Sequence, residues 1–126
     1  MVFCLASQLE NTGSNLDFFL IMRNFIKTLI PFVDNFHRHQ RFILGARIEN
    51  MALDILDLLL EAYYGPKATK KAKLLQVNLS IEKLRHLLRL VFELHYLNAK
   101  KFDRLIAELL EIGRMVGGWL KSLEKS

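Results

Sequence analysis

The segment KFDRLIAELLEIGRMVGGWLKSL, residues 101–123, decides the fold class. Its apolar side chains recur at alternating spacings of three and four, at Phe102, Leu105, Leu109, Ile112, Val116, Trp119 and Leu123. This spacing places all of them on one face of an α-helix. The segment therefore predicts an amphipathic helix over about residues 100–123, whose apolar face packs into a protein core.

The same period occurs three more times upstream. Apolar stripes at helical spacing predict further helices over about residues 16–36, 41–64 and 67–98. Gly65-Pro66 should end the second helix, and Asn98 should end the third. Because the connections are only a few residues long, consecutive helices should run antiparallel, and no window alternates as a strand does. We expect an all-α fold, an up-down-up-down four-helix bundle over residues 16–126.

The composition excludes several classes of protein. A length of 126 residues fits one domain, and a hydrophobic fraction of 52% with 25% charged residues is typical of a folded globular chain. Residues 1–15 lack a sustained period, so we expect an N-terminal tail there. The single cysteine, Cys4, favours a reducing, cytoplasmic setting. No uncharged apolar run approaches the ~18 residues of a membrane span, so we expect no membrane insertion or export.

Positive charge is concentrated in the second half of the chain. Residues 1–66 carry five basic and seven acidic side chains, whereas residues 67–126 carry thirteen basic and six acidic ones. The halves therefore have net charges of −2 and +7, which sum to the +5 of the whole chain. Such an asymmetry favours a polyanionic partner, a nucleic acid or a nucleoprotein.

The candidate binding residues lie mainly on the third predicted helix. Four lysines crowd its start, at Lys67, Lys70, Lys71 and Lys73, and Lys83, Arg85 and Arg89 follow. Dense cations can release counterions from a phosphate backbone, although a lysine run is also common on a solvated helix face. Arg85 and Arg89 are four residues apart and share a face, and arginine binds phosphates with a fixed fork geometry. We expect this pair to bind phosphate groups of the partner.

Glycines inside two predicted helices indicate close packing. Gly113 and Gly117 share one helical face, where glycine costs about 1 kcal/mol relative to alanine. Such a cost is offset if another backbone approaches closely, from a helix of the same bundle or from another subunit. Gly45 suggests close packing as well. Its neighbour Arg47 is expected to pair with an acidic residue such as Asp54 or Glu111.

Motifs for catalysis are absent from the sequence. There is no nucleophile elbow, phosphate-cradling glycine loop or zinc-type cysteine pair, so we expect no enzyme activity and no cofactor. Glu82 and His86 are four residues apart, which imitates half of a carboxylate–histidine metal site, and Glu93 could complete a site inside the bundle. No second such pair occurs in the sequence, so we expect no residue of this chain to bind a metal ion.

Three motifs in order resemble a known family. They are RF-x-LG-x-RI-x-N at residues 41–50, LR-x-x-LR at residues 84–89, and GR-x-x-GGW at residues 113–119. Together with Pro31 in the first helix, they make the chain similar to the Avd-type four-helix-bundle family over about residues 16–123. These proteins are the accessory variability determinants of diversity-generating retroelements, and they are related to four-helix proteins encoded in intervening sequences of bacterial rRNA.

The resemblance implies a function and an assembly. It implies a homopentameric barrel with basic surfaces that bind template RNA, its cDNA and the retroelement's reverse transcriptase. Carried over by position, Arg85 and Arg89 would make these contacts, and Arg114 is a second candidate, with a structural role as its alternative. An alternative is an RNA-associated or structural role like that of the rRNA-intervening-sequence proteins, and neighbouring genes would distinguish the two. A third hypothesis is a metal enzyme that uses Glu82, His86 and Glu93.

Overall fold

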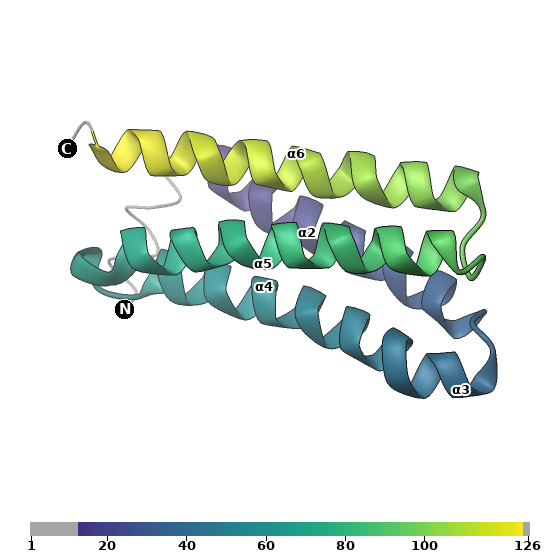
Figure 1. Cartoon of the computed structure of the whole chain (residues 1–126). Coiled ribbons are helices and arrows are strands. Elements are labelled where there is room, and N and C mark those ends of the chain that lie inside the picture. The colour runs from purple at the N-terminus through teal and green to yellow at the C-terminus, as the bar shows by residue number, and fades with distance from the viewer. Residues whose placement is uncertain (1–12, 125–126) are drawn as a thin grey trace.

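The computed structural model describes residues 13–124 and consists of helices joined by short turns (Figure 1). Its elements are α2 (Gly13–Asp34), α3 (Arg38–Gln40), the π-helical turn η1 (Arg41–Gly45), α4 (Ala46–Tyr64), α5 (Lys67–Glu93) and α6 (Ala99–Glu124). No strand occurs among these residues, which confirms the all-α prediction. Of the tail expected at residues 1–15, residues 1–12 lie outside the described residues. Residues 13–15 belong to the first turn of α2.

The four long helices form a bundle around one core. α5 packs against α4 and α6, and α2 packs against the same two helices. α2 and α5 are therefore diagonal neighbours, and Figure 1 shows α5 in front of α2. The predicted helical bundle is confirmed.

The apolar stripes found in the sequence form the core. In α6 the middle of the stripe is buried, and its ends at Phe102, Trp119 and Leu123 are half-buried. Large side chains from all four helices are fully buried, among them Phe25, Leu29, Ile55, Leu59, Leu84, Leu88, Leu105 and Leu109. Burying one such side chain contributes roughly 1.5–3 kcal/mol, so these stripes hold the bundle together.

The third long helix ends five residues before the predicted break at Asn98. α5 stops at Glu93, and His95 adopts a left-handed conformation with φ of 68°. The His95 amide donates to the Phe92 carbonyl (3.0 Å), and the Tyr96 amide donates to the Val91 carbonyl (2.9 Å). This pair of bonds is a Schellman motif, which caps the last carbonyls of a helix. Asn98 instead directly precedes α6 and caps its first turn, where the Asn98 Oδ1 accepts from the Lys101 amide (2.8 Å).

The first two predicted helices also differ from the structure at their ends. α2 begins and ends somewhat before the predicted bounds of 16 and 36. The predicted helix over 41–64 is helical throughout, but its first five residues form the π-helical turn η1.

Gly45 and the glycines of α6 differ in how closely their neighbours pack. A Cβ on Gly45 would lie 2.7 Å from Val33 Cγ1, so the predicted close packing at Gly45 is confirmed. A Cβ on Gly113 would make ordinary contact with Ile81 Cγ2 at 3.9 Å, and Cβ atoms on Gly117 and Gly118 would meet nothing within 4 Å. The α6 glycines therefore do not serve packing inside this bundle. Approach by another subunit remains the prediction for them.

Candidate nucleic-acid interface

The basic side chains of α5 fall into two groups. Lys67, Lys70, Lys71 and Lys73 lie in its first two turns, whereas Lys83, Arg85 and Arg89 lie in its second half. At 1.5 Å per residue, Lys67 and Arg85 are separated by about 27 Å along the helix axis. The structure therefore does not bring the predicted residues together into one site.

Two of the four lysines at the start of α5 bond to α4. Lys70 Nζ donates to the carbonyls of Ala62 (2.7 Å) and Tyr63 (3.0 Å), which belong to the last turn of α4. Lys73 Nζ forms an ion pair with Glu61 Oε1 at 2.9 Å. A cation at a helix C-terminus satisfies carbonyls that have no partner in the helix. Lys70 and Lys73 thus hold the α4–α5 turn.

The other two lysines are exposed at the end of the bundle. Lys67 and Lys71 line a shallow hollow with Leu123 and Glu124, at the C-terminal end of α6. Their side chains face solvent, and Glu124 brings negative charge to the same hollow. They resemble the solvated helix face that lysine runs commonly form.

Arg85 and Arg89 share a notch between α5 and α6. It has a volume of about 290 Å³ and is lined by Arg85, His86, Arg89, Phe102 and Ile106, which we call the arginine notch. The Arg89 guanidinium carbon lies 6.0 Å from the centroid of the Phe102 ring. That ring stacks on Phe92 with centroids 4.4 Å apart and an interplanar angle of 13°. A guanidinium held over an aromatic ring is preorganised for binding.

The arginine notch has more positive than negative charge. Arg85 Nη2 forms an ion pair with Glu82 Oε2 at 2.6 Å, and Arg85 Nε is buried without a hydrogen-bond partner. Arg89 has no ion pair among residues 13–124. The notch is therefore lined by two guanidinium groups, and only the Glu82 carboxylate offsets their charge. Such a surplus can bind one or more phosphate groups.

Arg114 lies outside the arginine notch, on the exposed surface of α6. Its Nε donates to Glu111 Oε2 at 3.0 Å, and its Nη2 donates to Glu111 Oε1. The hydrogen bond from Arg114 holds the pKa of the Glu111 carboxyl below its ordinary value. Arg114 is therefore engaged within its own helix.

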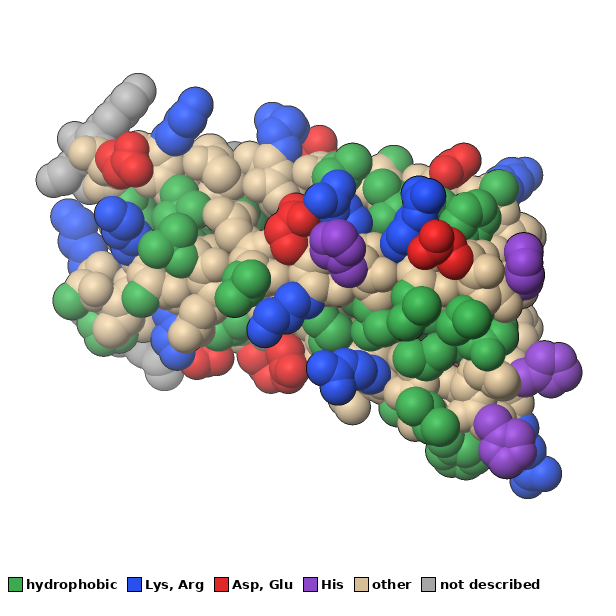
Figure 2. Space-filling view, viewed as in Figure 1, with side chains coloured by type: hydrophobic (Ala, Val, Ile, Leu, Met, Phe, Trp, Pro, Cys, Tyr) green, Lys and Arg blue, Asp and Glu red, His purple; other side chains and the backbone are tan. Residues whose placement is uncertain are grey.

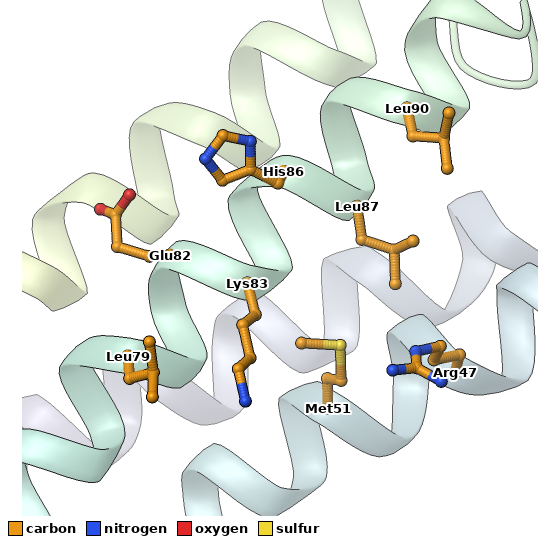
Figure 3. A pocket seen from close by; sticks show the side chains of 8 residues that line it. All are labelled: Arg47, Met51, Leu79, Glu82, Lys83, His86, Leu87 and Leu90. Carbon is orange, nitrogen blue, oxygen red and sulfur yellow. The ribbon is translucent and has the colours of Figure 1, made fainter.

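Lys83 faces the other side of α5, toward α4. Together with Arg47, Met51, Leu79, Glu82, His86, Leu87 and Leu90 it lines a hollow of about 570 Å³, which we call the α4–α5 groove (Figure 3). The predicted ion pair of Arg47 with Asp54 or Glu111 is wrong. Glu111 is bonded to Arg114, and no ion pair of Arg47 exists in the part of the chain that the structure describes.

Sequence reasoning missed two residues of these sites. The spacing of apolar residues places Phe102 in the core stripe, but its side chain is half-buried and forms the floor of the arginine notch. Its position at the outer end of the α6 stripe was the available signal. The sequence predicts a structural ion pair for Arg47, but its exposed side chain lines the α4–α5 groove.

The structure gives the metal-enzyme hypothesis no support. Glu82, His86 and Glu93 are all exposed on α5, and Glu82 is paired with Arg85. Within residues 13–124 no three histidine, cysteine or acidic side chains are close enough to share a metal ion.

No helix in the described range is both long and apolar enough to span a bilayer. The face of the molecule that carries α5 instead shows hydrophobic side chains interspersed with basic and acidic ones (Figure 2).

Comparison with known proteins identifies the family. Searches of curated proteins and of solved structures returned no significant match. A family model described as bAvd-like matches residues 20–123, which include α4 and α5 in full, α2 from Leu20 onward and α6 up to Leu123. The match confirms the resemblance inferred from the three motifs. Because it spans most of the sequence, the chain belongs to the bAvd-like family.

Proposed function

We propose that this chain is a non-enzymatic accessory protein of a diversity-generating retroelement. It binds the template RNA and its cDNA together with the reverse transcriptase, and thereby supports mutagenic copying. The observation that carries the proposal is the family match over residues 20–123, because the family is of an accessory, non-catalytic type. The net charge of +7 on residues 67–126 supports a polyanionic partner.

The arginine notch is the proposed contact with nucleic acid. Arg89 offers a guanidinium that is already positioned by Phe102 and that pairs with no carboxylate within residues 13–124. Arg85 retains donors beyond the one that it gives to Glu82. A phosphate in the notch would accept hydrogen bonds from both arginines, and the surrounding apolar side chains would limit competition by water. Lys67 and Lys71 would add weaker, longer-range attraction.

Assembly into a homopentamer is part of the proposal. Several large apolar side chains are exposed on a single chain, among them Leu53, Leu60 and Leu110, which favours cover by another subunit. Light scattering would measure the mass. A pentamer of this 14.7 kDa chain has a mass of roughly 74 kDa.

The salt dependence of RNA binding tests the nucleic-acid contact. For a single-stranded RNA, the logarithm of the binding constant should fall with a slope of about −0.7 per phosphate contact against the logarithm of salt concentration. The double variant Arg85→Ala/Arg89→Ala should weaken binding about tenfold and reduce the slope by about 1.4. Helicity and oligomer size should not change.

A matched control variant distinguishes the loss of the arginine notch from the loss of positive charge alone. Arg23 and Lys27 are exposed on α2, diagonal to α5, so Arg23→Ala/Lys27→Ala removes the same charge from elsewhere. It should weaken RNA binding much less than the α5 variant. Equal effects of the two variants, or a slope near zero in the unmodified protein, would contradict the proposed contact.

Gene neighbourhood tests the biological context. A reverse-transcriptase gene and paired repeats beside this gene would support the retroelement role. A location inside an rRNA locus would instead favour the alternative, an RNA-associated or structural protein of the intervening-sequence type.

A further inference from the structure

The proposed RNA contact uses only the side of α5 that faces α6, and the other side carries a second surface. The α4–α5 groove extends from Leu79 to Leu90, eleven residues or about 16 Å along α5. Its volume of about 570 Å³ is nearly twice that of the arginine notch. The groove is therefore long enough to hold about three turns of a bound helix.

The floor of the groove is aliphatic. Met51 and Leu87 are half-buried and point toward one another between the two helices (Figure 3). Leu79 is 57% exposed and Leu90 is 43% exposed, although both are large apolar side chains. No phenylalanine, tyrosine or tryptophan lines the groove, and its one aromatic ring is the exposed His86 imidazole, which the groove shares with the arginine notch. The groove therefore offers little of the stacking platform that nucleobases use. Aliphatic side chains of a protein fit such a floor better than bases do.

The walls of the groove carry charges that have no partner. Arg47 from α4 and Lys83 from α5 lie on either side of Met51 (Figure 3), and neither forms an ion pair within residues 13–124. Next to Leu79 the groove continues into a second hollow that Asp54, Asp57 and Glu61 line, and Lys83 lies at the border of the two hollows. Glu82 also lines the groove, but it is paired with Arg85, and Glu61 is paired with Lys73. Among residues 13–124, the charges left without an ion pair are therefore basic in the groove half of the surface and acidic in the half beyond Leu79. The acidic half would repel a phosphate backbone.

From this pattern we propose that the α4–α5 groove binds an amphipathic helix of a partner protein. The helix would place aliphatic side chains at positions i, i+3 or i+4, and i+7 on the floor of the groove. Its carboxylates would flank that stripe and pair with Arg47 and Lys83. A basic residue about two turns away would meet Asp54 and Asp57. The groove thus selects a protein helix by both apolar contact and charge order.

A second copy of this chain is a less suitable occupant. The basic and acidic halves lie on one surface, so two copies that meet groove to groove could satisfy both only by pairing antiparallel about a twofold axis. That contact closes a dimer and leaves the groove unable to join further subunits. In a ring, a different face of the next subunit would have to fill the groove, and the oligomer mass measured below detects that case. A helix from a different protein satisfies the same charges without this restriction.

Two synthetic helical peptides test the proposal. Both carry the same leucine stripe over sixteen residues; in one the stripe is flanked by glutamates in its first half, and in the other by lysines. Fluorescence anisotropy with the full-length protein should show at least tenfold tighter binding of the glutamate peptide. The double variant Arg47→Glu/Lys83→Glu should reverse this preference, whereas Arg23→Glu/Lys27→Glu on α2 should preserve it. Equal binding of the two peptides, or no binding of either, would overturn the proposal.

A pair of uncharged variants separates this surface from the RNA contact. Leu79→Ser/Leu90→Ser should weaken the glutamate peptide at least tenfold and leave RNA affinity unchanged. The control Leu20→Ser/Leu75→Ser replaces leucines that are 46% and 51% exposed outside the groove, and it should change neither. If the groove variant lowers the oligomer mass, a second copy occupies the groove and the proposal is wrong. If it weakens RNA binding instead, the groove belongs to the nucleic-acid contact.

Discussion

At the start of α5, Lys70 and Lys73 bond to α4, while four turns further along the same helix Arg85 and Arg89 flank an open notch. The two groups have equal charge and similar spacing. They differ in what the neighbouring helix offers, which is carbonyls and a carboxylate at α4 and an aromatic ring at α6. Charge density along a sequence therefore does not distinguish cations that hold the fold from cations that are available to a ligand.

The largest expected effect comes from removing Lys70. Lys70→Met loses two charge-assisted hydrogen bonds to the last carbonyls of α4 and should lower the free energy of unfolding by about 2 kcal/mol. Urea denaturation measures this, with Lys71→Met as the control because Lys71 is exposed. If Lys70→Met weakened RNA binding as strongly as the arginine variant while stability held, the contrast between the two groups would be lost.

The next effect concerns the stacked arginine. Arg89→Lys keeps the charge but loses the planar guanidinium over Phe102, so RNA affinity should fall about fivefold, or about 1 kcal/mol. Arg104→Lys, on the exposed surface of α6, should leave the affinity unchanged. Equal RNA affinity of Arg89→Lys and the unmodified protein would show that only the charge at this position matters.

A smaller effect measures the ion pair of the lysine group. The Lys73–Glu61 pair is 33% and 51% exposed, so a double-mutant cycle to alanine should give a coupling energy of about 0.2–1 kcal/mol. The measurement is chemical denaturation of the four proteins in the cycle. A coupling of zero would leave Lys70 alone as the structural cation of this group.

The smallest effect is a pH dependence at Glu108. Burial raises the pKa of the Glu108 carboxyl, and Arg104 at 3.9 Å lowers it only in part. An acid whose pKa is raised on folding stabilises the protein below its unfolded pKa and loses that contribution as pH rises through the folded pKa. Glu108→Gln should therefore be more stable than the unmodified protein at pH 7, by less than about 1 kcal/mol, and equally stable at pH 3. Lower stability of Glu108→Gln at pH 7 would mean that the ion pair outweighs burial.

The fold could be predicted from the sequence because each helix carries an uninterrupted apolar stripe. The end of α5 could not be predicted in this way, since Leu94 and Leu97 continue the apolar stripe past Glu93, where the helix ends. A Schellman motif usually has glycine in its left-handed position, and here that position is occupied by His95. The stripe reports which side chains are apolar but not where the backbone leaves the helix.

The candidate site was only partly predictable for a related reason. The helical spacing of Arg85 and Arg89 places them on one face, and the structure confirms that they share a notch. The contribution of Phe102 depends on how α5 and α6 are aligned, which no local pattern encodes. The bonds of Lys70 to Ala62 and Tyr63 depend in the same way on the turn at Gly65-Pro66.

His86 lies on the ridge of α5 and lines both the arginine notch and the α4–α5 groove. One imidazole thus forms a common boundary of two recognition surfaces. A ligand that fixes the rotamer of this ring on one side alters the wall that a ligand on the other side meets. By thermodynamic linkage the effect is reciprocal, so a polyanion and a protein segment bound to one subunit would each change the affinity of that subunit for the other.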